Sequence, residues 1–248
     1  MYRVLVNGCN GKMGQLVMNL LDSSSDFVAI GGMDKENTGE YTFPVYTDFY
    51  QIQELPDVII DFSVPQATLG ILSFAEQHHI PVVIATTGFS QEQQKKIEES
   101  SKQIPIFQSS NMSYSIYIMG KIAQILTTSL EGADIELIET HHNRKIDSPS
   151  GTALYLANKV KEASNIPLHY NLNRMTQREK RQKDEIGFSS IRGGNIVGEH
   201  TIQFFLPEET FEIKHTCYSR TVFAQGALKA AKFLIGKPNG FYGMEHLS

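Results

Sequence analysis

Residues 7–14 read N-G-C-N-G-K-M-G and govern how the N-terminal part of the chain folds. They follow a short apolar run at residues 2–6, which predicts a β-strand, and they precede apolar side chains at helical spacing in residues 16–21. Glycines between a strand and a helix are the context of a dinucleotide-binding turn. A turn that needs flexible glycines for another reason is the alternative.

The three glycines have distinct expected roles. Gly8 allows a tight turn, Gly11 lets the backbone approach a pyrophosphate, and Gly14 lets the helix pack close to the strand. The spacing is G-x-x-G-x-x-G, with Asn10 where the commoner pattern has its middle glycine. The sequence therefore predicts a dinucleotide site at this turn.

Asp34 follows a second predicted strand, residues 27–33. A carboxylate there accepts a ribose hydroxyl and repels a 2′-phosphate, which favours NADH. Lys12 and Lys35 offset that repulsion, although both could simply be solvated surface lysines. We expect NADH and NADPH both to be accepted, with NADH preferred.

Further apolar strands at residues 58–61, 81–85 and 104–107 alternate with helical patterns, which predicts a parallel, doubly wound sheet. Polar turns follow two of these strands, Asp61-Phe62-Ser63 and Thr86-Thr87-Gly88. Ligands of open α/β sheets bind at this edge, so both turns are candidates to reach nicotinamide or substrate.

The pattern changes after residue 111. A helix at residues 115–126 leads to a strand at 134–140, and residues 186–218 are mostly β before a last helix at 222–234. The predicted fold class is α/β: a Rossmann-like dinucleotide-binding domain, residues 1–112 and 220–248, with an inserted α+β substrate-binding and oligomerisation domain, residues 113–219. The charge run at residues 176–185 is expected to be solvated.

Composition excludes several classes of protein. The net charge of −5 argues against nucleic acid as the main partner. No apolar run approaches the ~20 residues needed to span a bilayer, so no membrane association is expected. Two cysteines without a motif suggest a reducing, cytoplasmic setting.

Residues 139–153 read E-T-H-H-N-R-K-I-D-S-P-S-G-T-A and concentrate the chemistry of the second domain. Ser150-Gly151-Thr152 precedes apolar residues at helical spacing, so a helix is expected to begin there. Free amides at a helix start attract anions. With Lys145 and the histidine pair, the stretch predicts a site that holds a small carboxylate and moves protons beside it.

The histidines at 141 and 142 are adjacent, so in a continuing strand they point to opposite sides. This argues against both binding one metal, and no metal site is predicted. A Ser-His-Asp hydrolase is not expected either, because G-x-S-x-G is absent.

With these residues in hand, the chain closely resembles the dihydrodipicolinate reductase family, now called 4-hydroxy-tetrahydrodipicolinate reductases, of diaminopimelate and lysine biosynthesis. The resemblance runs nearly end to end, through N-G-C-N-G-K-M-G, D-F-S-V-P, A-T-T-G-F, S-S-N-M-S, I-R-G-G-N-I-V-G-E-H-T and R-T-V-F-A-Q-G-A. The pattern H-H-x-x-K-x-D-x-P-S-G-T-A is its most specific part.

The resemblance implies an NAD(P)H-dependent oxidoreductase that gives hydride to an unsaturated cyclic dicarboxylate and forms tetrahydrodipicolinate. It implies His141 as the acid and Lys145 as proton donor or carboxylate partner. Implied substrate contacts are His142, Ser150, Gly151, Thr152 and Thr87. Implied cofactor contacts are Gly8, Asn10, Gly11, Lys12, Met13, Asp34, Lys35, Ser63, Ala85, Thr87, Ser110 and Met112. It also implies a homotetramer formed through the sheet of the inserted domain.

The chain departs from the family's usual pattern near the expected nicotinamide pocket. Ala85 stands where the family usually has Gly, Met112 where it often has an aromatic, and Val64 where relatives are often basic. The departures bear on cofactor affinity and preference. Two alternatives remain open: a different dehydrogenase on a similar scaffold, acting on an amino acid or a semialdehyde, and a protein that binds NAD(H) without catalysis.

Overall fold

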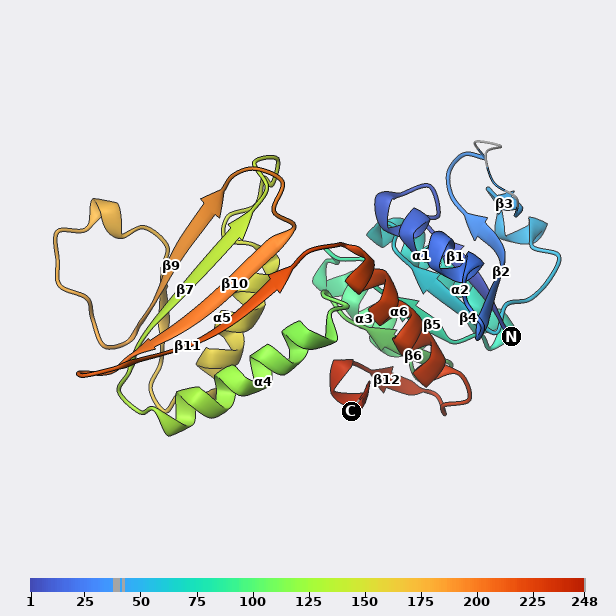
Figure 1. Cartoon of the computed structure of the whole chain (residues 1–248). Helices are drawn as coiled ribbons and strands as arrows, with labels where there is room; N and C mark the ends of the chain where they lie inside the picture. The colour runs from blue at the N-terminus through green and yellow to red at the C-terminus, as the bar shows by residue number, and fades with distance from the viewer. Residues whose placement is uncertain (38–40, 42, 248) are drawn as a thin grey trace. The chain divides into compact units, whose positions relative to one another are not determined.

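The computed structural model describes residues 1–37, 41 and 43–247. The chain forms two compact units, which we call unit 1 and unit 2. Unit 1 comprises Met1–Ser113 and Arg220–Ser248, and unit 2 is Tyr114–Ser219. Figure 1 shows that both ends of the chain belong to unit 1. Unit 2 is therefore an insertion in the sequence of unit 1.

Unit 1 is built on a seven-stranded sheet with the order β12-β6-β5-β4-β1-β2-β3. All of its neighbouring strands run parallel. The strands are β1 (Tyr2–Asn7), β2 (Phe27–Met33), β3 (Val45–Tyr46), β4 (Val58–Asp61), β5 (Val82–Ile84), β6 (Pro105–Gln108) and β12 (Gly240–Tyr242). Strands β2 and β3 extend the sheet on one side of β1, and β4, β5, β6 and β12 extend it on the other. This is the Rossmann-type order, in which a crevice lies at the carboxyl ends of β1 and β4.

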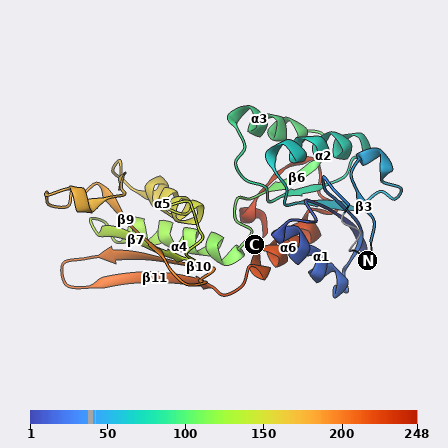
Figure 2. The same cartoon turned by 90° about the horizontal axis from the view of Figure 1, so that it is seen from above.

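Helices cover both faces of this sheet. Figure 2 shows α2 (Pro65–His78) and α3 (Gln91–Ser100) on one face, with α1 (Lys12–Asp22) and α6 (Thr221–Leu234) on the other. Because both faces are covered, the central strands are buried throughout: β4 is fully buried, as are residues 4–7 of β1. The short helices are η1 (Phe49–Gln51) and η3 (Met244–Leu247).

Local sequence explains where the helices of unit 1 begin. Pro65 occupies the first turn of α2, where its missing N–H costs nothing. Ser90 and Gln93 form the predicted capping box at the start of α3. By contrast, the residue before α1 is Gly11, which supplies no side-chain cap. The first amides of α1 are therefore left for another acceptor.

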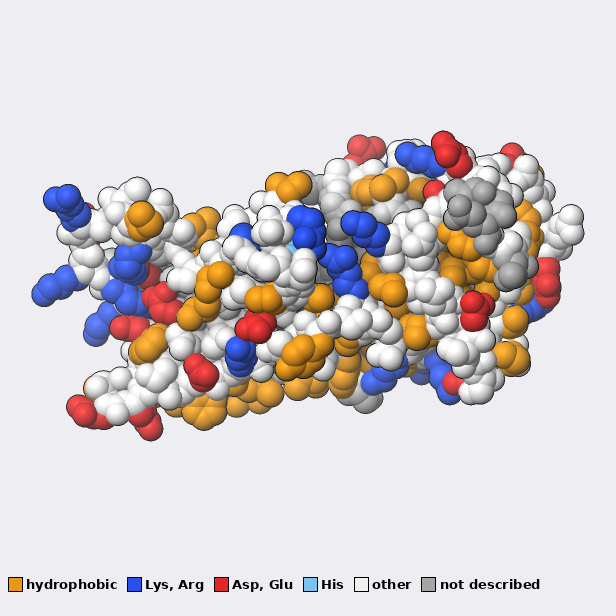
Figure 3. All heavy atoms as spheres, turned by 45° about the horizontal axis from the view of Figure 1, so that its top comes forward, with side chains coloured by type: hydrophobic (Ala, Val, Ile, Leu, Met, Phe, Trp, Pro, Cys, Tyr) orange, Lys and Arg blue, Asp and Glu red, His pale blue; other side chains and the backbone are white. Residues whose placement is uncertain are grey.

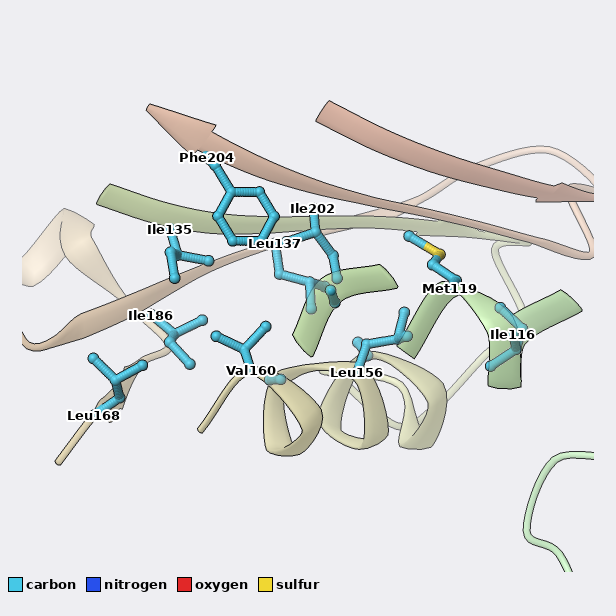
Figure 4. Close-up of a cluster of buried hydrophobic side chains, with 13 residues drawn as sticks. Ile116, Met119, Ile135, Leu137, Leu156, Val160, Leu168, Ile186, Ile202 and Phe204 are labelled. Atoms are coloured by element: carbon cyan, nitrogen blue, oxygen red, sulfur yellow. The ribbon is translucent and has the colours of Figure 1, made fainter. Parts of the chain in front are cut away.

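Unit 2 contains a mixed five-stranded sheet with the order β11-β10-β7-β9-β8. Its strands are β7 (Asp134–His141), β8 (His169–Asn171), β9 (Glu185–Arg192), β10 (Gly198–Phe205) and β11 (Thr210–Cys217). Two helices, α4 (Tyr114–Ser129) and α5 (Gly151–Ala163), pack against the sheet, and η2 (Arg174–Thr176) precedes β9. Figure 4 shows the core between them, with Leu137 and Ile202 of the strands meeting Leu156 and Val160 of α5.

Strand alternation determines what each side chain of β7 faces. Ile135, Leu137, Glu139 and His141 are all buried, whereas the residues between them are partly exposed. Two aliphatic residues at one end of the strand thus give way to a carboxylate and an imidazole at the other, on the same side of the sheet.

The predicted α/β class, with an α+β insertion, is confirmed. The short strands β3, β8 and β12 were not predicted. The prediction of a merely solvated charge run at residues 176–185 is wrong in part. Arg181 donates to Asp134 at 2.8 Å and to Glu136 at 3.3 Å, and Glu185 is buried against Arg174. Figure 3 shows positive and negative side chains intermingled at this end of unit 2.

Candidate functional site

The carboxyl edge of the sheet in unit 1 contains a pocket of about 570 Å³. Six of the residues predicted to contact a cofactor line it: Gly8, Asn10, Gly11, Asp34, Lys35 and Ser63. Phe62, of the turn predicted to reach a ligand, and Val64, noted as a departure from the family pattern, also line it. Sequence reasoning did not select the other lining residues, Asn7, Met33, Thr47, Phe49 and Ala67. Thr47, Phe49 and Ala67 belong to no motif, because the fold alone brings them beside the glycine turn.

Two glycines show why the turn at residues 7–14 needs its pattern. Gly8 has φ +81°, and a Cβ there would lie 2.6 Å from the carbonyl oxygen of Phe62. A Cβ on Gly14 would lie 2.1 Å from the carbonyl oxygen of Gly8. The turn and the start of α1 are therefore packed backbone against backbone. Such a helix start presents its free amides to an anion such as a pyrophosphate.

Asp34 is tied to the same turn. One carboxylate oxygen accepts the amide of Asn10 at 2.9 Å, and the other accepts the amide of Lys35 at 2.8 Å. These bonds fix the carboxylate at the pocket wall and leave lone pairs for hydroxyl donors. The side chains of Lys12 and Lys35 are both exposed, and Lys35 lines the pocket.

Asp61 was predicted to lie in a turn that could reach a ligand. In the structure its side chain is buried instead and does not line the pocket. It is 0% exposed and accepts four hydrogen bonds: from Asn7 Nδ2 (2.7 Å), Ser63 Oγ (2.5 Å), Thr68 Oγ1 (2.6 Å) and Thr86 Oγ1 (2.8 Å). Burial raises the pKa of Asp61, and these hydrogen bonds oppose the rise. Asp61 thus joins the ends of β1, β4 and β5, while Ser63 and Phe62 of the same turn face the pocket.

The remaining predicted cofactor residues lie outside the pocket lining. Met13 and Ala85 are half-buried, Thr87 and Ser110 are exposed, and the side chain of Met112 is buried in unit 1. Thr87 and Ser110 follow β5 and β6, at the same carboxyl edge of the sheet as the glycine turn.

In unit 2, the predicted anion site lies at the start of α5. The hydroxyl of Ser150 caps the helix by accepting the amide of Ala153 at 3.1 Å. Ser150 itself is buried, whereas Gly151 is exposed and Thr152 half-buried. A Cβ on Gly151 would meet no atom within 4 Å, so no neighbouring group crowds the position of a side chain there. The first amides of such a helix start can receive a carboxylate.

Lys145 lies in the loop between β7 and α5. Its ammonium donates to Asp147 at 2.7 Å, and the lysine side chain is 21% exposed. Burial would raise the pKa of Asp147, but hydrogen bonds from Lys145 and from the backbone of Gly151 lower it on balance. A carboxylate of the protein therefore lies between the lysine and the helix start, which shows that this corner stabilises a carboxylate.

Glu139 and Arg192 complete the predicted histidine site, and sequence reasoning missed both. Glu139 contacts Nδ1 of His141 with one oxygen. With the other it accepts Arg192 Nη2 at 2.7 Å and the amide of Ser150 at 3.3 Å. Burial would raise the pKa of Glu139, but hydrogen bonds from His141, Arg192 and Ser190 prevail and lower it to about 2. The cluster joins β7, β9 and the start of α5 through one ionised carboxylate.

His200 of β10 was also missed. Its Nε2 lies 3.1 Å from the hydroxyl of Ser150, and its ring meets that of His141 edge-on, with centroids 5.2 Å apart. Burial lowers the pKa of His200 to about 3, with a further lowering by His141. This histidine is therefore neutral at physiological pH and acts as a hydrogen-bond partner of the helix cap.

Glu139, His141 and His200 bring possible metal-ligating atoms within 4.8 Å of one another. Their contacts do not suit a cation. Arg192 already places a positive charge on Glu139, and Nε2 of His200 faces the hydroxyl of Ser150. The contact of Glu139 with His141, the two bonds of Ser150 and the pairing of β7 with β10 account for the proximity of these three groups.

The half-buried His142 follows the buried His141 at the end of β7, so the two side chains have different surroundings. None of the helices in the described residues is long and apolar enough to cross a membrane.

Comparisons with known proteins match both parts of the chain to one family. Residues 2–112 match "Dihydrodipicolinate reductase, N-terminus", and residues 115–247 match "Dihydrodipicolinate reductase, C-terminus". A 4-hydroxy-tetrahydrodipicolinate reductase of Caldanaerobacter subterraneus subsp. tengcongensis is 47% identical over 247 residues, covering 100% of this chain and 98% of the relative. One from Clostridium tetani is 44% identical, covering 99% and 96%.

A solved structure agrees on the fold. The dipicolinate-bound dihydrodipicolinate reductase of Paenisporosarcina sp. TG-14 superposes with a TM-score of 0.80 at 24% identity, covering 100% of both chains. The sequence matches extend over the glycine turn and the stretch from His141 to Thr152 alike. The chain belongs to the dihydrodipicolinate reductase family.

Proposed function

We propose that this protein is a 4-hydroxy-tetrahydrodipicolinate reductase, which uses NAD(P)H to form tetrahydrodipicolinate in diaminopimelate and lysine biosynthesis. Relatives of that name match the whole chain at up to 47% identity. The observation that carries the proposal is the start of α5, where Gly151 and Lys145 already stabilise the carboxylate of Asp147, beside the Glu139–His141 pair. A dicarboxylate that must take up a proton requires these two features together.

The residues of unit 1 fit a nicotinamide dinucleotide. The free amides at the start of α1 suit its pyrophosphate, and Asp34 suits a ribose hydroxyl. The proposed contacts are Gly8, Asn10, Gly11, Lys12, Met13, Asp34, Lys35, Ser63, Ala85, Thr87, Ser110 and Met112. When bound, the reduced cofactor supplies the hydride.

The residues of unit 2 hold the substrate and provide the proton. One substrate carboxylate takes hydrogen bonds from the amides of Gly151 and Thr152 and from Lys145. The other proposed substrate contacts are His142, Ser150 and Thr87. Charge-assisted hydrogen bonds of this kind contribute roughly 1.5–3 kcal/mol each. To bind, the substrate carboxylate must take over the contacts that Lys145 and the backbone of Gly151 make with Asp147.

The reaction balances as one hydride and one proton. Loss of water from the 4-hydroxy substrate leaves an unsaturated ring, the hydride adds to one end of a double bond, and the proton from His141 adds to the other. His141 then regains its proton from solvent. The step is general acid catalysis beside a fixed positive charge.

The cofactor preference follows from Asp34. Its carboxylate is fixed by two backbone amides and would face a 2′-phosphate at that position. We expect NADH to be preferred and NADPH to be accepted, because Lys12 and Lys35 partly compensate the charge.

We further propose a homotetramer formed through the sheet of unit 2, as the family resemblance implies, and a cytoplasmic location. In support, α4 and α5 both pack against one face of that sheet (Figure 2). Light scattering on the purified chain should give four times the monomer mass of 27.8 kDa.

A coupled assay tests the function. The substrate is generated enzymatically in the cuvette, this protein is added, and absorbance at the reduced-nicotinamide band is followed with NADH and with NADPH. We expect oxidation of both cofactors. No oxidation of either one would reject the proposed function.

A further inference from the structure

Glu139 is a fully buried carboxylate two residues before His141 on the same side of β7. One of its oxygens contacts Nδ1 of His141, and the other accepts from Arg192 and from the amide of Ser150. It therefore lies between the proposed acid and the start of the proposed substrate site. The family resemblance from which the site was predicted assigns it no role.

The surroundings of Glu139 require the carboxylate to be charged. Burying an ionised carboxylate is costly unless donors satisfy it, and here His141, Arg192 and Ser150 all point donors at it. A buried ion pair contributes little net stability compared with a well-packed apolar replacement. This geometry is better explained by what it does to His141.

An ionised carboxylate can only accept hydrogen bonds, so Nδ1 of His141 must carry a proton. Nε2 is then the ring nitrogen that donates the proton and takes it back. Gly198 of β10 lies beside that atom, and a Cβ there would be 2.9 Å from Nε2. The glycine leaves room for the ring in this orientation.

The charged and titratable groups around the imidazole come from several elements. Arg192 reaches the cluster from β9, and His200 packs edge-on from β10. Lys145 of the loop, paired with Asp147, and His215 of β11 both act on His200. Most of these groups are positive or neutral. Glu139, by contrast, is negatively charged and contacts Nδ1 of His141 directly.

We propose that Glu139 is a positioning residue of the reductase site, which holds the His141 ring with a proton on Nδ1, so that Nε2 delivers the proton. This inference rests on the proposed function. Arg192 shares the same carboxylate and so opposes its effect on the ring. After each turnover the neutral ring keeps Nδ1–H and takes a proton from water at Nε2.

The first test compares Glu139→Gln with the matched control Glu136→Gln. Glu136 lies on the same strand but on the opposite side, where it pairs with Arg181 at 3.3 Å. We expect Glu139→Gln to lower kcat at neutral pH by at least about tenfold, with KM for the substrate changed less than about threefold. The limb of the kcat–pH profile that reports the acid should move to lower pH. The control should retain the wild-type profile.

Arg192→Gln tests the direction in which the limb of the kcat–pH profile moves. Removing this cation should move the same limb to higher pH, opposite to Glu139→Gln. A purely structural role for the cluster would lower activity in both variants without moving the limb in opposite directions. An unmoved limb in Glu139→Gln, or a kcat within twofold of wild type, would overturn the proposal.

A measurement on the unmodified chain covers the case in which these variants fail to fold. Nitrogen-15 NMR of the histidine rings in the full-length protein distinguishes the two ring nitrogens. We expect Nδ1 of His141 to stay protonated across neutral pH. Loss of the proton from Nδ1 in that range would refute the positioning role. This result does not depend on turnover, so it separates a failure of this inference from a failure of the proposed function.

Discussion

Replacing His200 by Gln should make the protein less sensitive to mild acid. His200 is 4% exposed, and burial lowers its pKa to about 3, against 6.5 for an ordinary histidine. Below pH 6.5 the unfolded chain takes up a proton at this position that the folded chain does not. The folded state therefore loses stability as pH falls from about 6.5 towards 3.

The magnitude follows from the proton uptake of the unfolded chain. Between pH 7.5 and 5.0, histidine in the unfolded chain becomes almost fully protonated while His200 in the folded chain stays neutral. The interval from the unfolded-chain pKa of 6.5 down to pH 5.0 is about 1.5 pH units. At about 1.36 kcal/mol per unit, the free energy of unfolding falls by about 2 kcal/mol. Any folded-state pKa below about 4 gives the same figure at pH 5.0.

Urea unfolding at the two pH values measures this loss. The comparison is the change in unfolding free energy from pH 7.5 to 5.0 in wild type, in His200→Gln and in a control, Thr201→Asn. Thr201 is the next residue of β10 and carries no titratable group. The wild type and the control should lose about 2 kcal/mol more than His200→Gln. Equal losses in all three proteins would refute the claim that His200 is buried and neutral.

The other predictions concern the two halves of the site. Lys145→Ala should lose more than about 100-fold in turnover while its melting temperature stays near wild type, because this loop lysine pairs with an exposed carboxylate, that of Asp147, and such pairs add little stability. Lys121→Ala, at an exposed position of α4, is the control. Near-normal turnover in Lys145→Ala would count against the substrate site. Asp34→Ser should raise the NADPH-to-NADH ratio of kcat/KM, and an unchanged ratio would show that Asp34 does not face the ribose. Asp61→Ala should lower the unfolding free energy by about 2–4 kcal/mol in urea titrations, since four buried or part-buried hydrogen bonds are lost and Asn7 Nδ2 keeps only its bond to Ser63 Oγ. A loss below ~1 kcal/mol would contradict the network. Gly198→Ala should reduce kcat more than it changes cofactor affinity, because its Cβ displaces the His141 ring, and a normal kcat would place that ring elsewhere.

Sequence patterns predicted the elements whose signals are local. Pro65 in the first turn of α2 and the capping box of Ser90 with Gln93 lie within a few residues of the helix ends that they define. The short strands β3, β8 and β12, of two or three residues, carry no such signal. They exist only because a neighbouring strand offers its backbone, as β6 does for β12.

The functional residues also divide into those that are contiguous in sequence and those that only strand pairing brings together. The glycine turn and the His141–Thr152 stretch are contiguous, so sequence alone could indicate them. Glu139 could also have been found, because it is two positions before His141 and alternation places both on one side of a strand. Arg192 and His200 are more than 50 residues from Glu139 and come near it only through the pairing of β7 with β9 and β10. No local pattern contains that register.

The most direct test of the central claim is the structure of the protein with reduced cofactor and dipicolinate bound together. Dipicolinate is a suitable probe because it is a stable, planar cyclic dicarboxylate, and a structural relative was solved with it bound. We expect one carboxylate to lie on the amides of Gly151 and Thr152 and on Lys145, with the ring about 3–3.5 Å from C4 of the nicotinamide. A dicarboxylate held by other residues, or a ring out of reach of C4 in every subunit, would contradict this expectation.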